Sequence, residues 1–414
     1  MSESGQRSAI MLPARENYRF MSAQEKHGGA TDPYRIFFPL GILMGIVGVS
    51  VWPLYYWGIA SGYNGRSHAF VQTDCFMYAF IAGFLWTAIP RFTGTSTPSR
   101  GAQFSVAGML AVAAVAFELQ YFQAGHLIFL AAHAAVIAVA VKRFRQRQHP
   151  PPETFVLVGI AMLSGLIGAV INAGIAWELV PAALDLIGKR LLSEGMILLL
   201  VLGVGGFLGP RLLGFAQLPN FQNLEKISGS TKTPAVVRHR QSMYAIAGFA
   251  LLLSVIVEYG WNVPALAWLR ASIASALVLF NIRPWQTPVV RTTLAWCVWT
   301  AHWLLIIALW LVAVLPKYRI DFLHILFIGA FTLLILAVAT RVVLSHGGHA
   351  LAEERKSWPL RIGLITGLIA MLARVGAPFA PAVYFSHLAW AGVLWIGGMS
   401  FWGIYLLRRI RTSH

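Results

Sequence analysis

Six histidines lie inside or at the start of long apolar stretches of this chain, where polar side chains are rare. They are His68, His126, His133, His302, His324 and His387. Imidazole is the common ligand of haem iron and of copper, so this residue type in such positions suggests metal ligation. Polar groups within a membrane usually face the interior of a helical bundle. The alternative is that a histidine at a helix end simply lies at the wet interface.

Spacing limits which histidines can act together. His126 and His133 share one helix face but differ by about 10 Å in height, so they cannot be the two axial ligands of one iron. His324 and His346 are separated by about 33 Å of helix and cannot share a metal. His346 lies in segment 345–349, Ser-His-Gly-Gly-His, which is either a second site or a solvated loop.

Few other charged residues lie within the apolar stretches. Arg270 is able to pair with Glu194, with Asp74 or with a haem propionate. Asp321 precedes His324 by three residues, so we expect its carboxylate to accept the ring N–H and fix the tautomer. Internal ion pairing without any chemistry is the alternative role for these charged groups.

The composition indicates which elements must position these side chains. Of the 414 residues, 57% are hydrophobic and only 11% are charged. Soluble chains carry about 25% charged residues, which excludes a soluble multidomain enzyme and a disordered protein. The 2 cysteines, Cys75 and Cys297, exclude a disulfide framework, a zinc ribbon and an iron–sulfur site, and we interpret them as buried hydrophobic residues.

Twelve stretches reach the length of about 20 mostly apolar residues that a membrane-spanning helix needs. They are 37–58, 69–89, 102–121, 123–141, 155–176, 191–210, 243–260, 262–280, 293–314, 322–343, 360–376 and 384–406. We therefore predict an all-α fold, a polytopic integral membrane bundle of about 12 transmembrane helices. It has a polar N-terminal tail at 1–33, a single membrane domain at 34–408 and a short C-terminal tail at 409–414.

The basic residues give an independent test of this topology. If the N-terminus is cytoplasmic, 25 of the 32 Lys and Arg residues fall on the cytoplasmic side and 6 on the opposite side. This asymmetry follows the positive-inside rule, so both termini are predicted to be cytoplasmic. The net charge of +17 is therefore explained by topology and not by nucleic-acid binding.

The second, sixth and tenth stretches run in the same direction and end alike. The similar residues are 83–85, 90–91 and 94 in the second, 206–208, 210–211 and 214 in the sixth, and 339–341 in the tenth. This similarity indicates a four-span period repeated three times as parallel repeats. The alternative is that any helix running toward the cytoplasm tends to finish with arginine.

Several motifs resemble those of the NnrS family of bacterial membrane proteins. Residues 324–330 and 339–348 look like the family's H-A-L-x-x-G-A block followed by T-R-V-x-L-G-H-x-G. Residues 81–90 and 93–94 are similar to its A-G-F-L-L-T-A-x-P-x-x-T-G block, and 34–38 resemble its Y-R-P-F-F opening. Ala301-His302 is similar to the family's L-H pair. The resemblance extends from about residue 34 to 350.

Two departures distinguish this chain from the family pattern. The H-x-H-E-M motif appears here as 68–72, which keeps the first histidine, His68, and lacks the second histidine, the glutamate and the methionine. The G-G-R-x-I-P motif appears as 205–210, with Phe207 in place of its arginine and Arg211 nearby. The chain therefore resembles a divergent branch.

The resemblance implies a protein of the bacterial cell inner membrane that holds haem b, with or without copper, and acts in nitric oxide metabolism or in protection against nitrosative stress. By motif match, the implied ligands are His68, His302, His324 and His346. The depth of His126, His133 and His387 alone makes them further candidates for cofactor binding, with Arg270 as a candidate partner of a propionate. The expected partners are the lipid bilayer, haem and nitric oxide.

Two other functions remain open at this stage, as does the question of catalysis. One is a secondary transporter without a cofactor, in which Asp74, Glu194 and Arg270 bind or couple the substrate. The other is an assembly partner of a respiratory oxidase. The metal stoichiometry, the electron donor and the oligomeric state are not determined by the sequence.

Overall fold

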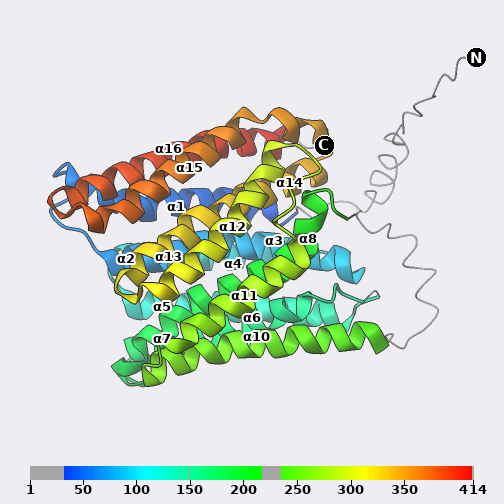
Figure 1. Cartoon of the computed structure of the whole chain (residues 1–414), viewed down its shortest axis with the longest axis horizontal. Helices are drawn as coiled ribbons and strands as arrows, with labels where there is room; N and C mark the ends of the chain where they lie inside the picture. The colour runs from blue at the N-terminus through cyan, green and yellow to red at the C-terminus, as the bar shows by residue number, and fades with distance from the viewer. Residues whose placement is uncertain (1–31, 149, 217–234, 413–414) are drawn as a thin grey trace, which may run out of the picture. The chain divides into compact units, whose positions relative to one another are not determined.

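The computed structural model describes residues 32–148, 150–216 and 235–412. Every regular element in these ranges is a helix, and twelve helices are long and apolar enough to cross a membrane. The predicted all-α, multi-pass architecture is therefore confirmed (Figure 1). Most of the predicted N-terminal tail, together with residues 413–414, lies outside the described residues.

Nine of the twelve described spans are built on one long α-helix each. They are α1 (Tyr34–Tyr56), α4 (Arg100–Glu118), α5 (Phe122–Arg145), α6 (Phe155–Ala176), α10 (Ala235–Trp261), α11 (Ala265–Ile282), α12 (Thr293–Val314), α15 (Trp358–Gly376) and α16 (Tyr384–Thr412). The predicted stretches 155–176 and 293–314 coincide with α6 and α12. The others differ by several residues because apolarity marks the membrane interior and not the helix ends.

The second, sixth and tenth spans are each built from three pieces. A six-residue α-helix leads into a seven-residue π-helical segment, which continues as an α-helix of 15 or 16 residues. The pieces are α2 (Gly65–Phe70), η1 (Val71–Met77) and α3 (Tyr78–Thr93); α7 (Asp185–Arg190), η3 (Leu191–Ile197) and α8 (Leu198–Leu212); and α13 (Arg319–His324), η5 (Ile325–Phe331) and α14 (Thr332–His346). Segments of π-helix are rare and often occur at functional sites.

These three spans also end in the same way. Gly94, Gly214 and Gly348 each follow the first residue of the π-helical segment by 23 positions, and their φ angles are 68°, 83° and 71°. A glycine can adopt the left-handed backbone conformation that ends a helix with little strain, because it has no Cβ. The predicted four-span period is therefore present in the structure.

The register of the repeat differs in detail from the one predicted. Pro90 and Pro210 do occupy equivalent positions, 19 residues after the start of η1 and η3. Gly83 and Gly206 do not, because they follow those starts by 12 and 15 residues. Arg341, 16 residues after the start of η5, is likewise not the counterpart of the arginine after Pro90. Sequence comparison of short glycine motifs therefore misplaced the repeat by up to one helical turn.

Packing follows the same threefold pattern. α1 packs against η1 and α3, α6 against η3 and α8, and α12 against η5 and α14. The remaining spans pair as α4 with α5, α10 with α11, and α15 with α16, and α16 returns to pack against α1 (Figure 1). The twelve helices thus form a closed arrangement with the three tripartite spans at its centre.

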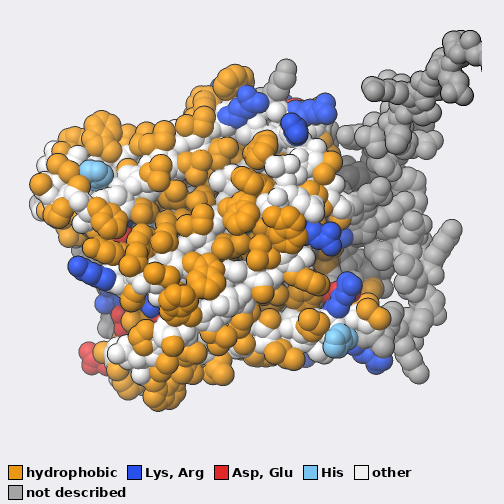
Figure 2. Space-filling model, in the orientation of Figure 1, with side chains coloured by type: hydrophobic (Ala, Val, Ile, Leu, Met, Phe, Trp, Pro, Cys, Tyr) orange, Lys and Arg blue, Asp and Glu red, His pale blue; other side chains and the backbone are white. Residues whose placement is uncertain are grey.

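The first and last spans meet at one end of the bundle, where Arg35 Nη1 donates a hydrogen bond of 3.0 Å to the carbonyl of Ile410. We call this the terminal end. Figure 2 shows a broad hydrophobic middle with Lys and Arg side chains toward its ends, and more of them toward the terminal end. The cytoplasmic orientation of this end stays a prediction.

Candidate functional site

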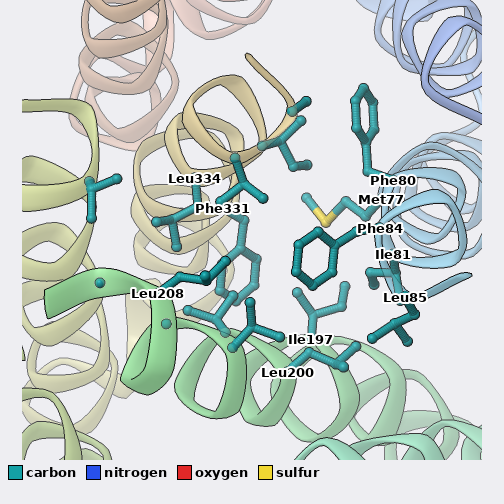
Figure 3. Close-up of a pocket in the computed structure, with 18 of the residues that line it drawn as sticks. Met77, Phe80, Ile81, Phe84, Leu85, Ile197, Leu200, Leu208, Phe331 and Leu334 are labelled. Atoms are coloured by element: carbon teal, nitrogen blue, oxygen red, sulfur yellow. The ribbon is translucent and has the colours of Figure 1, made fainter. Parts of the chain in front are cut away.

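The three tripartite spans meet around an apolar cavity. Figure 3 shows side chains from the three tripartite spans pointing toward one another across it, from the last residue of each π-helical segment and from the α-helix that follows. They are Met77, Phe80, Ile81, Phe84 and Leu85; Ile197, Leu200, Val201, Val204 and Gly205; and Phe331, Leu334, Ile335, Val338 and Ala339. Counted from the start of each π-helical segment, all three sets occupy positions 7, 10, 11, 14 and 15. The cavity therefore lies on a pseudo-threefold axis of the fold.

One polar side chain, that of His302 on α12, breaks this apolar symmetry. His302 is 1% exposed, and its Nδ1 donates a hydrogen bond of 2.6 Å to the carbonyl of Val298. Its Nε2 is buried and has no hydrogen-bond partner among the described residues, although the ring lines the cavity. An imidazole that donates Nδ1–H to a backbone carbonyl presents the lone pair of Nε2, which is the usual arrangement of a metal-ligating histidine.

Gly205, at position 15 counted from the start of η3, makes room for this imidazole. A Cβ built on Gly205 would lie 3.1 Å from His302 Nε2, whereas the equivalent positions hold Leu85 and Ala339. Either of those larger residues in place of Gly205 would push against the ring. The sequence predicted His302 as a ligand, but its relation to Gly205 is visible only in the structure.

Two further candidate histidines, His68 on α2 and His324 on α13, lie at the other end of the tripartite spans. His68 Nδ1 donates a hydrogen bond of 2.6 Å to the carbonyl of Gly48, and His324 Nδ1 donates one of 2.7 Å to the carbonyl of Ile320. The third short helix, α7, carries Arg190 as its last residue. Each of the three short helices α2, α7 and α13 therefore contributes one nitrogen-bearing side chain to this end of the axis. Both histidines have the ring geometry described for His302.

The expected contact between Asp321 and His324 does not form. Asp321 Oδ1 accepts a hydrogen bond of 2.8 Å from Arg374 Nη1, and the His324 ring N–H is taken by Ile320. The prediction was wrong because a carbonyl four residues earlier in the same helix is already in place for the ring. Asp321 instead forms an ion pair with Arg374 that links α13 to α15.

Arg270 lies in a buried charged network away from the central cavity. Its guanidinium pairs with Glu194 at 2.9 Å and with Glu258 at 2.7 Å, and the side chains of all three are at most 3% exposed. Arg319 also pairs with Glu258, and Arg190 pairs with Glu194 at 3.4 Å. The predicted pairing with Glu194 is thus confirmed. Glu258 and Arg319 were missed because they lie near the ends of their spans, where charge is unremarkable.

Asp74 is not part of that network. Its Oδ1 accepts a hydrogen bond of 2.7 Å from Thr73 Oγ1, and its Oδ2 has no hydrogen-bond partner in the described ranges, although the residue is 0% exposed. Asp74 and Glu194 both stand fourth in their π-helical segments. The repeats therefore place an acid at the same buried position twice and pair only one of them with arginine.

The remaining candidate histidines occupy separate sites. His126 is enclosed by the rings of Phe70 and Phe117 at centroid distances of 4.4 and 5.0 Å. His133 Nε2 donates a hydrogen bond of 3.0 Å to the carbonyl of Met162. His387 Nδ1 donates one of 3.1 Å to the carbonyl of Val383. None of these three lines the central cavity.

His346 lies near the terminal end, as its place in the chain predicts. Its ring meets that of Tyr34 edge-on at 5.9 Å, and it is within electrostatic range of Arg35 and Arg91. His349, three residues later, instead bonds to the carbonyl of Arg409 at 2.9 Å. The two histidines of segment 345–349 therefore have different partners.

A comparison with protein-family models decides the family. The model described as NnrS protein matches residues 30–411. The chain belongs to the NnrS family. The match also covers the last two spans, beyond the motifs found between residues 34 and 350. A comparison with curated proteins finds no match.

The histidines described above are the side chains of this NnrS protein that could serve as ligands of a haem iron or of a metal ion. Within residues 32–148, 150–216 and 235–412, no group of three or more His, Cys, Asp or Glu side chains could hold a metal ion. A haem iron already has four porphyrin nitrogens and needs only one or two axial ligands. His302 offers one such ligand in the cavity, and His68 with His324 offers two more at the opposite end.

Proposed function

We propose that this NnrS protein binds haem b in the central cavity, with His302 Nε2 as the axial ligand. The observation that supports the proposal is the buried, unpartnered Nε2 facing an otherwise apolar cavity. An unsatisfied polar atom in such a place costs about 1–3 kcal/mol, which a ligand bound at Nε2 would offset.

The residues around the cavity suit each part of a haem group. Aromatic and aliphatic side chains such as Phe84 and Phe331 offer a water-free wall for the macrocycle. Arg211, the residue before the cavity-lining Leu212, forms no ion pair with a carboxylate of the described residues; its guanidinium lies over the Phe207 ring at 3.8 Å and donates to the Phe207 carbonyl, and it would have to leave these contacts to pair with a propionate. Haem would supply an iron centre that binds nitric oxide, and nitric oxide itself partitions into apolar surroundings.

A second metal, copper or a second haem iron, is proposed for the pair His68 and His324. The two rings come from different repeats and present Nε2 after Nδ1 has been fixed by a carbonyl. His346 has no imidazole partner described beside it and stands as a separate candidate near the terminal end. We infer that the protein resides in a bacterial inner membrane and acts in nitric oxide metabolism or protection against nitrosative stress.

The test is an absorption spectrum and a metal analysis of protein purified from haem-sufficient cells. A Soret band that is lost or strongly weakened in His302→Ala, and kept in His387→Ala, is the expected result. His387 is a matched control because its imidazole has a similar carbonyl bond but does not line the cavity. A colourless, metal-free preparation of the wild type would refute the proposal.

A cofactor-free transporter and an oxidase assembly partner remain distinguishable by experiment. Proton-coupled uptake into liposomes that survives replacement of His68, His302 and His324 would favour a transporter. Stable copurification with oxidase subunits would favour an assembly role. Nitric oxide consumption by the purified haem-loaded protein would establish catalysis.

A further inference from the structure

A basic pocket lies at the terminal end between the beginnings of α12 and α15. Three arginines line it, Arg291 before α12, Arg355 in the 3₁₀ turn η6 (Leu351–Lys356), and Arg361 in the first turn of α15. Thr292 and Thr293 contribute hydroxyl groups at the start of α12. This pocket is separate from the central cavity and shares no lining residue with it.

Among the described residues, no carboxylate pairs with the arginines of this pocket. None of the three guanidinium groups forms an ion pair with a carboxylate of residues 32–148, 150–216 and 235–412. The two nearest acids in sequence are used elsewhere, because Glu354 accepts two hydrogen bonds from Arg341, at 2.8 and 2.9 Å, and Glu353 pairs with Arg409 at 2.9 Å. Three arginines without a described carboxylate partner therefore line one pocket, and their charge favours binding of an anion.

The inner surface of the pocket also presents free hydrogen-bond donors. Arg361 Nε donates a hydrogen bond of 3.1 Å to Thr293 Oγ1, which fixes the guanidinium and leaves its two terminal nitrogens for a ligand. The Thr292 hydroxyl oxygen accepts from the backbone N–H of Ala295 at 3.1 Å, so its own proton is available to an acceptor. Arginine forks of this kind match the oxygens of a phosphate group.

Tryptophans beside the pocket indicate its depth in the membrane. Trp296 lines it and is 37% exposed, and Trp358 at the start of α15 is 67% exposed. The guanidinium of Arg361 lies over the Trp358 ring at 5.3 Å. Exposed tryptophans at the ends of membrane spans mark the level of lipid headgroups. A headgroup phosphate can therefore reach this pocket while its acyl chains stay in the bilayer.

We propose that this pocket binds the phosphate of an anionic phospholipid in the leaflet at the terminal end. Basic pockets between transmembrane helices are suited to such headgroups. Leu364, one turn beyond Arg361, gives the pocket an apolar side for the first part of an acyl chain. The site is independent of the proposed haem function, because it needs neither His302 nor the central cavity.

The experiment measures phosphatidylglycerol binding to the detergent-purified full chain by native mass spectrometry. The test variant carries Arg291→Gln, Arg355→Gln and Arg361→Gln. At about a fivefold loss for each arginine, we expect its affinity for phosphatidylglycerol to fall roughly 100-fold. Zwitterionic phosphatidylcholine should bind weakly to both proteins. Equal phosphatidylglycerol binding by the test variant and the wild type would overturn the proposal.

A matched control removes the same charge from the same end of the bundle. Arg238, Arg408 and Arg411 are exposed and do not line the pocket, and their replacement by glutamine should change the affinity by less than about twofold. An equal loss in this control would show that bulk charge attracts the lipid and would overturn the site. If the triple variant fails to fold, as judged by size exclusion, Arg291→Gln alone should still weaken binding about fivefold.

A separate arm uses inorganic phosphate alone to identify the source of the anion. Phosphate that only competes weakly with phosphatidylglycerol supports the lipid assignment. Tight binding of inorganic phosphate without selective retention of phosphatidylglycerol would overturn it in favour of a soluble ligand.

Discussion

The Nε2 atom of His302 lies 3.1 Å from the point at which a side chain on Gly205 would begin. The two residues come from different repeats, on α12 and α8. Leucine and alanine occupy the same position in the other two tripartite spans. The absence of a Cβ at Gly205 therefore leaves room for the His302 imidazole at one of three otherwise equivalent places in the apolar cavity.

Gly205→Ala should weaken haem binding by crowding His302. Overpacking at a tight contact costs about 1–3 kcal/mol, which corresponds to a loss of affinity of roughly 5- to 100-fold. The measurement is haem content and Soret position of the purified variant. Gly206→Ala is the control, since its Cβ would meet Thr154 Cγ2 at a similar 3.2 Å and Gly206 does not line the cavity. Equal haem loss in both variants would show that the effect is general packing.

His68→Ala and His324→Ala should each remove the same second metal. If both imidazoles hold one ion, the double variant will lose no more metal than either single variant, because the two changes act on one site. Copper and iron per chain are measured by elemental analysis, with His133→Gln as a control buried imidazole outside the pair. Additive losses would indicate two separate sites.

Glu194→Gln should destabilise the protein much more than Asp74→Asn, although the two acids occupy equivalent positions. Glu194→Gln leaves the buried Arg270 with an incomplete set of counter-ions, and breaking a buried ion pair costs about 3–5 kcal/mol. Asp74 has no cation among its described partners, so an amide of the same shape should cost less than about 1 kcal/mol. Thermal unfolding in detergent compares the two, and similar melting temperatures would contradict this account.

Gly214→Ala should be more harmful than Gly348→Ala. Both glycines have φ angles in the left-handed region, which costs an alanine about 1–2 kcal/mol. A Cβ on Gly348 would meet open space, whereas one on Gly214 would approach Val290 Cγ2 to 2.6 Å. Unfolding measurements should therefore show that Gly348→Ala lowers the free energy of unfolding by about 1–2 kcal/mol, the cost of the left-handed backbone alone. Gly214→Ala should lower it by more. Gly108→Ala, in open space without a positive φ, should have little effect.

The sequence by itself determined the twelve spans. A stretch of about 20 apolar residues has few alternatives to a membrane helix, because unpaired backbone groups are too costly in lipid. It also determined the depth of each histidine, since position along a helix fixes height. His126 and His133 accordingly occupy separate environments, and His346 lies at the other end of its span from His324.

Only the tertiary structure decided which side chains meet. Depth leaves the direction of a side chain around its helix undetermined, and that direction depends on how the helices pack. The close approach of Gly205 to His302 and the pairing of Asp321 with Arg374 both join residues from different spans. The π-helical segments were also invisible in the sequence, because one extra residue per turn leaves an apolar stretch just as apolar.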